Sequence, residues 1–307
     1  MKAEKENPQS EAILADNSGL GTDGALSLPD KLARYSEARR LTLRMQRYVA
    51  SIGEVKEARK LASCANYLVF RHYFTVDKLR LHAASFCKKH LLCQMCAIRR
   101  GAKMLAAYLE KFGAVIAEQP HLRPYLVTLT VKNGDDLAER FRHLRGAMRR
   151  MFQARQSHLR GRGPFVQFAR SQGGFHSIEV TNKGKGWHPH VHMIWLCGSE
   201  PDQEALSREW LDLTGDSYIV DVRPLHDPVE GFLEVCKYAL KFSDLSHADN
   251  WQAYKVLSGQ RLIDSHGCMR GVVIPESLLD EPLDELPYVE LFYRYVIGLG
   301  YSLSDSV

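Results

Sequence analysis

The sequence lacks any uninterrupted apolar run of the roughly 18 to 20 residues that a membrane-spanning helix needs. Its N-terminus, rich in Glu, Asp and Ser, also lacks the apolar core of a secretory signal peptide. Cysteine is sparse, and the odd number of seven suits reduced thiols better than a disulfide framework. No internal repeat is visible. These absences predict a cytoplasmic protein without membrane attachment and without disulfide bonds.

Positive charge is concentrated in one part of the chain. The net charge is +5, but residues 31–170 carry 29 Lys and Arg against 9 Asp and Glu, a net charge of +20. Such a segment favours nucleic acid as the partner, because Lys and Arg neutralise phosphates and release counterions. A solvated basic face that meets the acidic remainder of the same fold is the alternative. The positions expected to contact DNA are Arg99, Arg100, Lys103, Arg149 and Arg150.

Composition and pattern divide the chain into four segments. Residues 1–30 combine Gly, Ser, Asn and Asp with few aromatics and are expected to be a disordered acidic tail. Residues 31–115 are expected to form a basic helical region with a cysteine cluster, and residues 116–245 a mixed domain of strands and helices. The last segment, 246–307, contains the aromatic run 291–296 and is expected to pack as helices of unknown role.

Strand and helix signals alternate in the third segment. A β-branched, period-two run over 124–131 predicts a strand, and the runs 174–180 and 187–196 flank a Gly- and Lys-rich turn and predict a hairpin. Strands separated by helices, with a hairpin among them, predict an α+β fold whose central antiparallel sheet is flanked by helices. Helices are expected at 98–116, 136–159, 204–214 and 228–242, and an extended stretch at 218–222.

A His-x-His pair lies in the second strand of the hairpin. Side chains alternate along a strand, so His190 and His192 project from one face and can share one divalent cation. If the hairpin turns around residues 184–185, Glu179 lies directly across from His190 on that face and supplies a third ligand. A slip of one residue would move Glu179 to the other face. Taken alone, the pair fits two ordinary surface histidines at least as well.

The helix expected from residue 228 carries a polar stripe opposite an apolar face. Four residues recur at helical spacing and form this stripe: Glu234, Lys237, Tyr238 and Lys241. Lysines beside Tyr238 stabilise its phenolate, which is a nucleophile for phosphorus when it lies near a metal-bound phosphate. Lys241 would then help to stabilise charge on the phosphoryl oxygens. A solvated charged face with a rim tyrosine is the simpler account of this helix alone.

The bunched cysteines predict a structural zinc site. A Cys-x2-Cys knuckle is half of a common tetrahedral zinc site, and two further thiols are available to complete it. Buried free thiols are the alternative account, and His82 or His90 is the other choice for the fourth ligand. The four expected zinc ligands are Cys64, Cys87, Cys93 and Cys96.

Four of these features, in their order along the chain, resemble a known family. Residues 124–131, 187–195 and 234–241 are similar to the three motifs of the plasmid rolling-circle replication initiators, within the HUH endonuclease superfamily. The cysteine region is similar to the cysteine-rich stretch in the single-tyrosine branch of that family. Each motif is short, and the resemblance, from about residue 64 to residue 241, depends on all four.

The resemblance implies a fold, a reaction and a set of partners. The fold is an HUH-nuclease-like central antiparallel sheet flanked by helices, preceded by a helical, zinc-binding region. The enzyme is a metal-dependent, site-specific single-strand endonuclease and strand transferase in the bacterial cytoplasm. Its expected partners are plasmid origin DNA, single-stranded or hairpin at the nick site and duplex nearby, together with a host helicase and polymerase.

The resemblance also implies roles for individual residues. His190 and His192, with Glu179, bind Mg²⁺ or Mn²⁺. Tyr238 attacks the plus strand, keeps the 5′ phosphate as a covalent adduct and leaves a 3′-OH primer. Glu234 activates water for the terminating cleavage, and a rejoining step closes the strand. Helical spacing independently predicts that Glu234 lies beside Tyr238.

Two other functions remain compatible with the sequence. An HUH transposase would share the chemistry, because some insertion elements also carry one tyrosine downstream of the His motif. A relaxase fits less well, since relaxases usually carry the tyrosine ahead of that motif. A zinc-dependent DNA-binding regulator without nuclease activity would leave the His-x-His pair incidental, and formation of a covalent DNA adduct distinguishes it from the enzyme.

Overall fold

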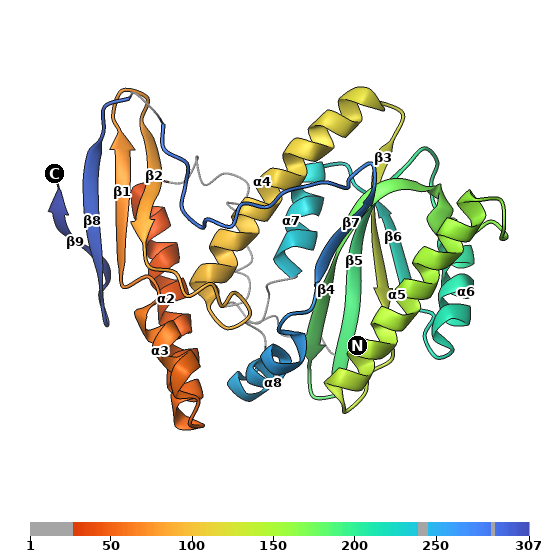
Figure 1. Ribbon diagram of the computed structural model, residues 1–307, viewed down its shortest axis with the longest axis horizontal. Coiled ribbons are helices and arrows are strands. Elements are labelled where there is room, and N and C mark those ends of the chain that lie inside the picture. Colours follow the sequence, from red (N-terminus) through yellow and green to blue (C-terminus); the bar gives the residue numbers. More distant parts are fainter. Residues whose placement is uncertain (1–26, 239–244, 284–285, 307) are drawn as a thin grey trace, which may run out of the picture. The chain divides into compact units, whose positions relative to one another are not determined.

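The computed structural model describes residues 27–238, 245–283 and 286–306, which belong to two compact units (Figure 1). One unit comprises residues 106–273. The other combines the chain before residue 106 with the chain after residue 273. Among the described residues, no helix has both the length and the apolarity that a membrane span needs.

The discontinuous unit contains a four-stranded antiparallel sheet covered by a helix. Tyr35 stacks on Phe70 with 6.4 Å between ring centroids, and Tyr293 packs edge-on against the same Phe70 ring. Its helices are α2 (Leu28–Ser51), α3 (Val55–Ser63) and the first part of α4 (Gln94–Glu118). Its strands, in the spatial order β2-β1-β8-β9, are β1 (Tyr67–Tyr73), β2 (Lys78–Ala84), β8 (Val289–Val296) and β9 (Gly300–Ser306).

This sheet is the main departure from the expected secondary structure. The sequence predicted a helical region over 31–115 and helices over 246–307, but β1, β2, β7, β8 and β9 lie in those segments, with α8 as the described helix of the second. The aromatic run 291–296 is strand β8, and Leu68 of β1 pairs with Tyr293 within it. The backbone hydrogen-bonding groups of β1 and β8 are satisfied by partners more than 200 residues away in the sequence. A local sequence pattern does not predict such a pairing.

The expected boundaries also differ from those of the structure. Boundaries were expected after residues 115 and 245, whereas the compact units divide after residues 105 and 273, and the C-terminal part joins the N-terminal part. Residues 1–26 of the expected acidic tail lie outside the described residues. Helix α2 begins at Leu28, where the Ser27 side chain accepts a hydrogen bond from the Asp30 amide, so the last residues of that tail are helical.

The continuous unit is built on a five-stranded antiparallel sheet in the order β6-β3-β5-β4-β7. Its strands are β3 (Arg123–Thr130), β4 (Ser171–Asn182), β5 (Trp187–Cys197), β6 (Val220–Pro224) and β7 (Ile263–Gly267). Its helices are the remainder of α4, α5 (Leu137–Leu159), the 3-10 turn η2 (Gln167–Arg170), α6 (Gln203–Thr214), α7 (Pro228–Tyr238) and α8 (His247–Leu257). These elements confirm the predicted α+β fold with a central antiparallel sheet flanked by helices.

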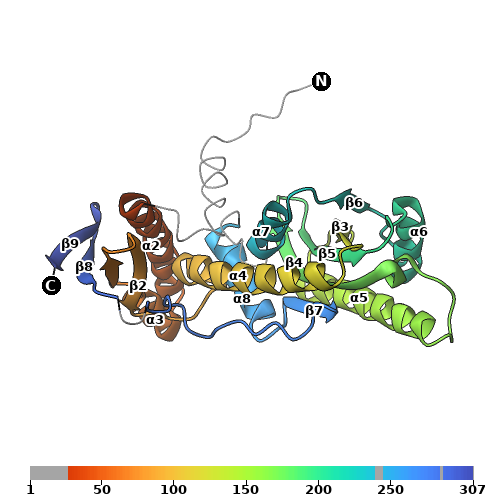
Figure 2. The ribbon, with the colours of Figure 1, turned by 90° about the horizontal axis from the view of Figure 1, so that it is seen from above.

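Helices cover both faces of this sheet (Figure 2). Helix α5 covers one face, where Val191, Met193 and Trp195 of β5 are fully buried. Helix α7 covers the other face, where the Phe175 ring of β4 lies 4.8 Å from the Phe232 ring. Because helices cover both faces, β4 and β5 are buried along most of their length, and β5 is also largely apolar, since a side chain that points away from one layer meets another.

Local signals fix where the helices of this unit begin. Asp136 precedes α5, and its carboxylate accepts hydrogen bonds from the amides of Ala138 and Glu139. Asp227 caps α7 in the same way, accepting from the Val229 amide at 2.8 Å. Pro228 follows as the first residue of α7, a position where its missing amide hydrogen costs nothing. The predicted helix starts at 136 and 228 are therefore confirmed.

Candidate functional site

The predicted hairpin brings a carboxylate and two imidazoles together. Glu179 of β4 pairs with His190 of β5 in the antiparallel register, and Gly184 and Gly186, both with positive φ, form the turn. The Glu179 Oε2 atom lies 2.9 Å from His190 Nε2 and 3.4 Å from His192 Nε2. One ligand atom from each residue lies within 4.8 Å of the other two. The expected juxtaposition is therefore present.

Hydrogen bonds hold both imidazoles with their Nε2 atoms toward Glu179. His190 Nδ1 lies 3.2 Å from the carbonyl oxygen of His188, and His192 Nδ1 lies 3.0 Å from Thr128 Oγ1 on β3. A carbonyl oxygen only accepts, so Nδ1 of His190 carries a hydrogen and, in the neutral ring, Nε2 offers a lone pair. That lone pair faces a carboxylate, which is also an acceptor. A shared proton or a metal cation between the two atoms relieves this conflict, so the residues fit a metal ion.

Burial shapes the electrostatics of this group. Burial alone raises the pKa of the Glu179 carboxyl, but its interactions with His190 and His192 outweigh burial, and the pKa is lowered. Burial lowers the pKa of His192, and it does the same for His188, which stacks on His190 at 5.1 Å. An ionised carboxylate beside a neutral imidazole is the protonation state in which both are metal ligands.

Helix α7 packs directly against this face of the sheet. Ser177 of β4, two residues before Glu179, donates its hydroxyl to the Val235 carbonyl at 2.7 Å. Val235 and Cys236 are buried, which confirms the predicted apolar face. Glu234 lies close enough to raise the pKa of His192 by its charge, against the larger effect of burial. The helix therefore brings one carboxylate of its polar stripe to the candidate metal centre.

The predicted nucleophile lies one helical turn beyond Glu234. Tyr238 is the last described residue of α7, and its backbone is described whereas its side chain is not. Lys241 and the rest of the expected helix to residue 242 lie outside the described residues. The structure thus places the helix of Tyr238 on the sheet face that carries His190 and His192, and the roles of Tyr238 and Lys241 stay predictions.

The four predicted zinc ligands form one cluster. Cys64 Sγ lies 3.5 Å from Cys93 Sγ and 3.6 Å from Cys96 Sγ, and Cys87 Sγ lies 3.6 Å from Cys96 Sγ. Tetrahedral zinc with bonds of about 2.3 Å spaces its sulfurs by about 3.8 Å. These four cysteines, like the other three of the chain, are free thiols in the structure. Among the described residues Cys64, and not His82 or His90, completes the cluster.

The cluster is also suited to a cation by its surroundings. Cys93 precedes α4, and its Sγ accepts a hydrogen bond from the Cys96 amide at 3.5 Å, so it lies at the positive end of that helix. Hydrogen bonds from the other thiols lower the pKa of Cys93 although burial raises it. The pKa of Cys64 is raised, first by its interaction with Cys87. Cys93 is therefore the first of these thiols to ionise, and its negative charge keeps the neighbouring thiols protonated. A bound cation would balance the charge of further thiolates.

Arg99, expected to contact DNA, has a structural role instead. Its side chain is 1% exposed, and it donates to the Leu278 carbonyl at 2.8 Å and to the Tyr35 hydroxyl at 2.9 Å. It also forms an ion pair with Asp280. A guanidinium whose donors are committed inside the protein cannot reach a phosphate, so the prediction for Arg99 is wrong. The pattern of adjacent basic residues does not distinguish the buried member.

The other expected DNA contacts are at least partly accessible. Arg100 and Lys103 are half-buried, and Arg149 and Arg150 are exposed on α5. Arg150 donates twice to the carbonyl oxygen of Leu213, near the C-terminal end of α6, at 3.1 and 2.5 Å. Its role in stabilising that helix end leaves it less available for phosphate than Arg149.

Sequence reasoning missed the residues that orient the candidate ligands. Thr128 lies opposite His192 in the β3–β5 register, so its hydroxyl meets the imidazole. A threonine in a strand next to the His-x-His strand is a signal that could have found it, once the pairing of the two strands is assumed. The contribution of His188 through its backbone carbonyl leaves no trace in the side-chain pattern.

The family model and the similar curated proteins point to the same family. The family model described as replication protein matches residues 78–286, more than half of the chain. A "Protein rep" from a Bacillus species is 34% identical over 182 residues, which are 56% of this chain and 54% of that protein. A "Protein rep" from Streptococcus pneumoniae is 30% identical over 182 residues, 53% of each protein. The match thus spans about half the length of these two relatives.

A third relative is covered more fully. A "Protein rep" from Bacillus amyloliquefaciens is 30% identical over 264 residues, which are 81% of this chain and 72% of that protein. No solved structure is significantly similar to the chain. The sequence relationship therefore supports the family independently of any structural neighbour.

Proposed function

Because the chain belongs to the replication protein family, we propose that it initiates the rolling-circle replication of a plasmid. In this function the protein nicks the plus strand at the origin and later ends the round with a second cleavage and a rejoining step. The observation that carries the proposal is the group formed by Glu179, His190 and His192 on the sheet face that α7 covers. A metal-ligating group beside a helix that carries a tyrosine is an arrangement suited to nucleophilic attack on phosphorus.

The metal would be held by Glu179 Oε2 and by the Nε2 atoms of His190 and His192. A mixed set of imidazole and carboxylate ligands is compatible with Mn²⁺ or Mg²⁺. When bound, the ion stabilises negative charge on the oxygens of the scissile phosphate. Thr128 would keep the His192 ring in its orientation through the hydrogen bond to Nδ1. The cluster of four cysteines would hold a structural zinc ion.

Tyr238 is the proposed nucleophile. Its phenolic oxygen forms a bond to phosphorus while the bond from phosphorus to the 3′ oxygen breaks. The phenol loses its proton and the departing 3′ oxygen gains one, so the products are a 5′-phosphotyrosine and a free 3′-OH. The 3′-OH primes synthesis by a host polymerase, with a host helicase opening the duplex. Lys241 would stabilise the charge on the phosphoryl oxygens.

Glu234 is proposed to act in termination. Its carboxylate lies one turn before Tyr238 on α7 and is 30% exposed, so water can reach it. As a general base it would remove a proton from a water molecule that attacks phosphorus in the terminating cleavage. Glu234→Ala is then expected to nick at a normal rate but to fail in the second cleavage, measured as unresolved covalent product. Normal termination in this variant would contradict the role of Glu234.

The test of the whole proposal is a covalent adduct. The protein is incubated with Mn²⁺ and labelled single-stranded DNA that carries its origin, and a labelled protein band resistant to denaturation is expected. Tyr238→Phe should abolish this band, whereas Tyr218→Phe, at an exposed tyrosine in the loop between α6 and β6, should keep it. An adduct that survives in Tyr238→Phe contradicts the assigned nucleophile. No adduct in the unmodified protein favours a DNA-binding regulator instead.

A further inference from the structure

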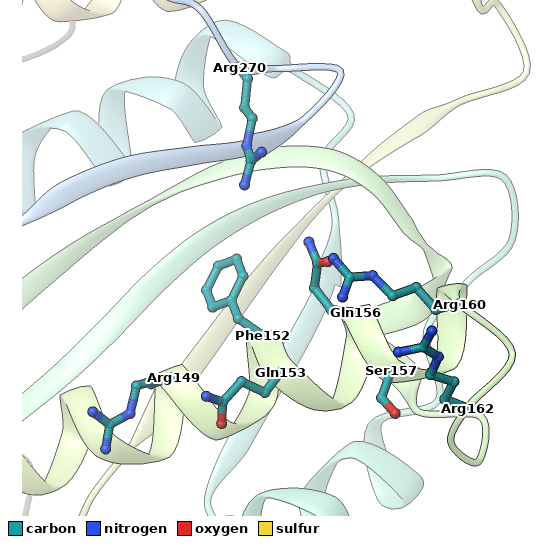
Figure 3. A pocket seen from close by; sticks show the side chains of 8 residues that line it. All are labelled: Arg149, Phe152, Gln153, Gln156, Ser157, Arg160, Arg162 and Arg270. Atoms are coloured by element: carbon teal, nitrogen blue, oxygen red, sulfur yellow. The ribbon is translucent and has the colours of Figure 1, made fainter.

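A hollow lined by arginines lies against α5 in the continuous unit (Figure 3). It has a volume of about 510 Å³, and Arg270, which follows β7, reaches into it from the side opposite α5. All four of its arginines are exposed. Its lining residues are Arg149, Phe152, Gln153, Gln156, Ser157, Arg160, Arg162 and Arg270.

The positive charge of this hollow is not balanced by the protein. No carboxylate lines it, and in the part of the chain that the structure describes none of its four arginines forms an ion pair. The effect reaches nearby groups: burial and then the charge of Arg270 lower the pKa of Arg155. Four exposed guanidinium groups without acidic partners form a site for an anion with several phosphates, because each planar fork matches a phosphate group.

The neutral side chains of the hollow suit the same ligand. Gln153, Gln156 and Ser157 offer hydrogen-bond donors, which commonly contact phosphate and sugar oxygens of nucleic acids. The single aromatic residue, Phe152, is engaged within the protein. Its ring packs edge-on against Phe168 at 4.9 Å and against His266 at 5.6 Å. It is therefore not a free platform on which an unpaired base stacks, whereas single strands are usually held on such platforms.

The hollow lies on the other face of the sheet from the candidate metal centre. Helix α5 covers the face that carries Val191 and Met193, while His190 and His192 project from the face that α7 covers. A strand bound at the metal centre therefore does not fill the hollow. Arg145 extends the basic surface along α5, and the 15 residues from it to Arg160 correspond to about 22 Å of helix, or roughly six nucleotides of one duplex strand.

We infer that this arginine hollow binds the sugar-phosphate backbone of duplex DNA next to the nick site. The inference deepens the proposed function and depends on it, since it assumes that the chain acts on origin DNA. Contacts to phosphates alone carry no sequence information, so the hollow supplies affinity and orientation for the flanking duplex. The strand to be cut is read and cleaved on the opposite face.

The test compares binding of two DNA forms by the full chain. Fluorescence anisotropy measures the affinity for a labelled duplex of about 25 base pairs and for a single strand of the same length, over a range of salt concentrations. In Arg160→Gln/Arg162→Gln, duplex affinity is expected to fall about 10-fold or more near 0.1 M salt. The slope of log K against log salt should flatten by about 2, because each lost phosphate contact removes about 0.9.

Two control variants separate charge at this site from general effects. Arg160→Lys/Arg162→Lys keeps both charges and should retain most of the affinity and the slope. Arg208→Gln removes an exposed charge from α6 and should leave both unchanged. An unchanged thermal unfolding midpoint in each variant shows that the fold is intact.

Three results would overturn the inference. Unchanged duplex affinity and salt slope in Arg160→Gln/Arg162→Gln would mean that the hollow does not bind DNA. An equal loss for the single strand would mean that it does not select the duplex, and an equal loss in Arg208→Gln would mean that net charge alone acts. None of these measurements needs cleavage, so a missing Tyr238 adduct, which would contradict the proposed nicking activity, is distinguishable from failure of the duplex site.

Discussion

Glu179 and His190 face each other across the β4–β5 hairpin, with 2.9 Å between the carboxylate and the imidazole nitrogen. The three candidate ligands all lie on these two adjacent strands. The neighbouring strand β3 adds Thr128, which holds the second imidazole. The ligands are therefore set by one strand register, and the orientation of His192 is set by a separate strand.

Replacing Thr128 tests whether this strand orients His192. Thr128→Val removes the hydrogen bond to His192 Nδ1 at almost constant volume, and we expect Mn²⁺ affinity to fall about 10- to 100-fold. Titration calorimetry of the metal measures the effect. Thr130→Val is the matched control, because Thr130 lies on the same strand but donates to the Ile219 carbonyl. Equal affinities in both variants would show that Thr128 does not orient the ligand.

Two buried histidines on the other face of the sheet predict a dependence of stability on pH. Burial lowers the pKa of His176 to about 4 and that of His266 to about 3, from the ordinary value of 6.5. Below pH 6.5 the unfolded chain binds protons that the folded chain does not, so stability is full above this pH and falls toward pH 4. The expected loss is on the order of 3 kcal/mol for each ring.

Chemical unfolding at pH 7 and pH 4 measures this loss. His176→Leu should flatten the pH dependence, because a titratable group is removed from the buried position. His226→Gln, at an exposed histidine, should leave it unchanged. A pH dependence in His176→Leu as steep as that of the unmodified protein would mean that other groups cause it.

The adjacent pair Arg99 and Arg100 predicts opposite behaviour for two neighbours. Arg99→Gln leaves Asp280 buried without its cation and should destabilise the discontinuous unit by about 3 to 5 kcal/mol. Arg100→Gln changes a half-buried position that forms no ion pair within the described part of the chain, and it should cost less than about 0.5 kcal/mol. Thermal unfolding compares them. Equal midpoints would contradict the structural role of Arg99.

The cysteine cluster predicts one equivalent of zinc per chain. Cys64→Ser should lose the metal, measured by elemental analysis, and should lower the unfolding midpoint of the unit that contains it. Cys268→Ser, at a half-buried cysteine outside the cluster, should retain the metal. Full zinc occupancy in Cys64→Ser would exclude this residue as a ligand.

The β4–β5 hairpin shows what sequence patterns can predict. Its turn, the two imidazoles on one face and the pairing of Glu179 with His190 all follow from period two and from glycines in the loop, and all are confirmed. The apolar face of α7 followed from helical spacing in the same way. These features depend on residues close in sequence, for which periodicity is informative.

The missed features depend on residues far apart. Strand β1 is completed by β8, and Arg99 is buried by Tyr35 and Asp280, so neither fact is visible in a local window. The arginine hollow is similar, since Arg270 joins α5 from more than 100 residues away. Tertiary pairing overrides local propensity at these positions.

The pairing of β1 with β8 has a consequence for the order of folding during synthesis. Residues 106–273 contain every strand of the five-stranded sheet, so that sheet can close before the last part of the chain leaves the ribosome. Strands β1 and β2 emerge earlier, yet their sheet must wait for β8. The discontinuous unit is thus the first to begin folding and the last to finish. Until β8 is synthesised, the edge of β1 that pairs with it stays open.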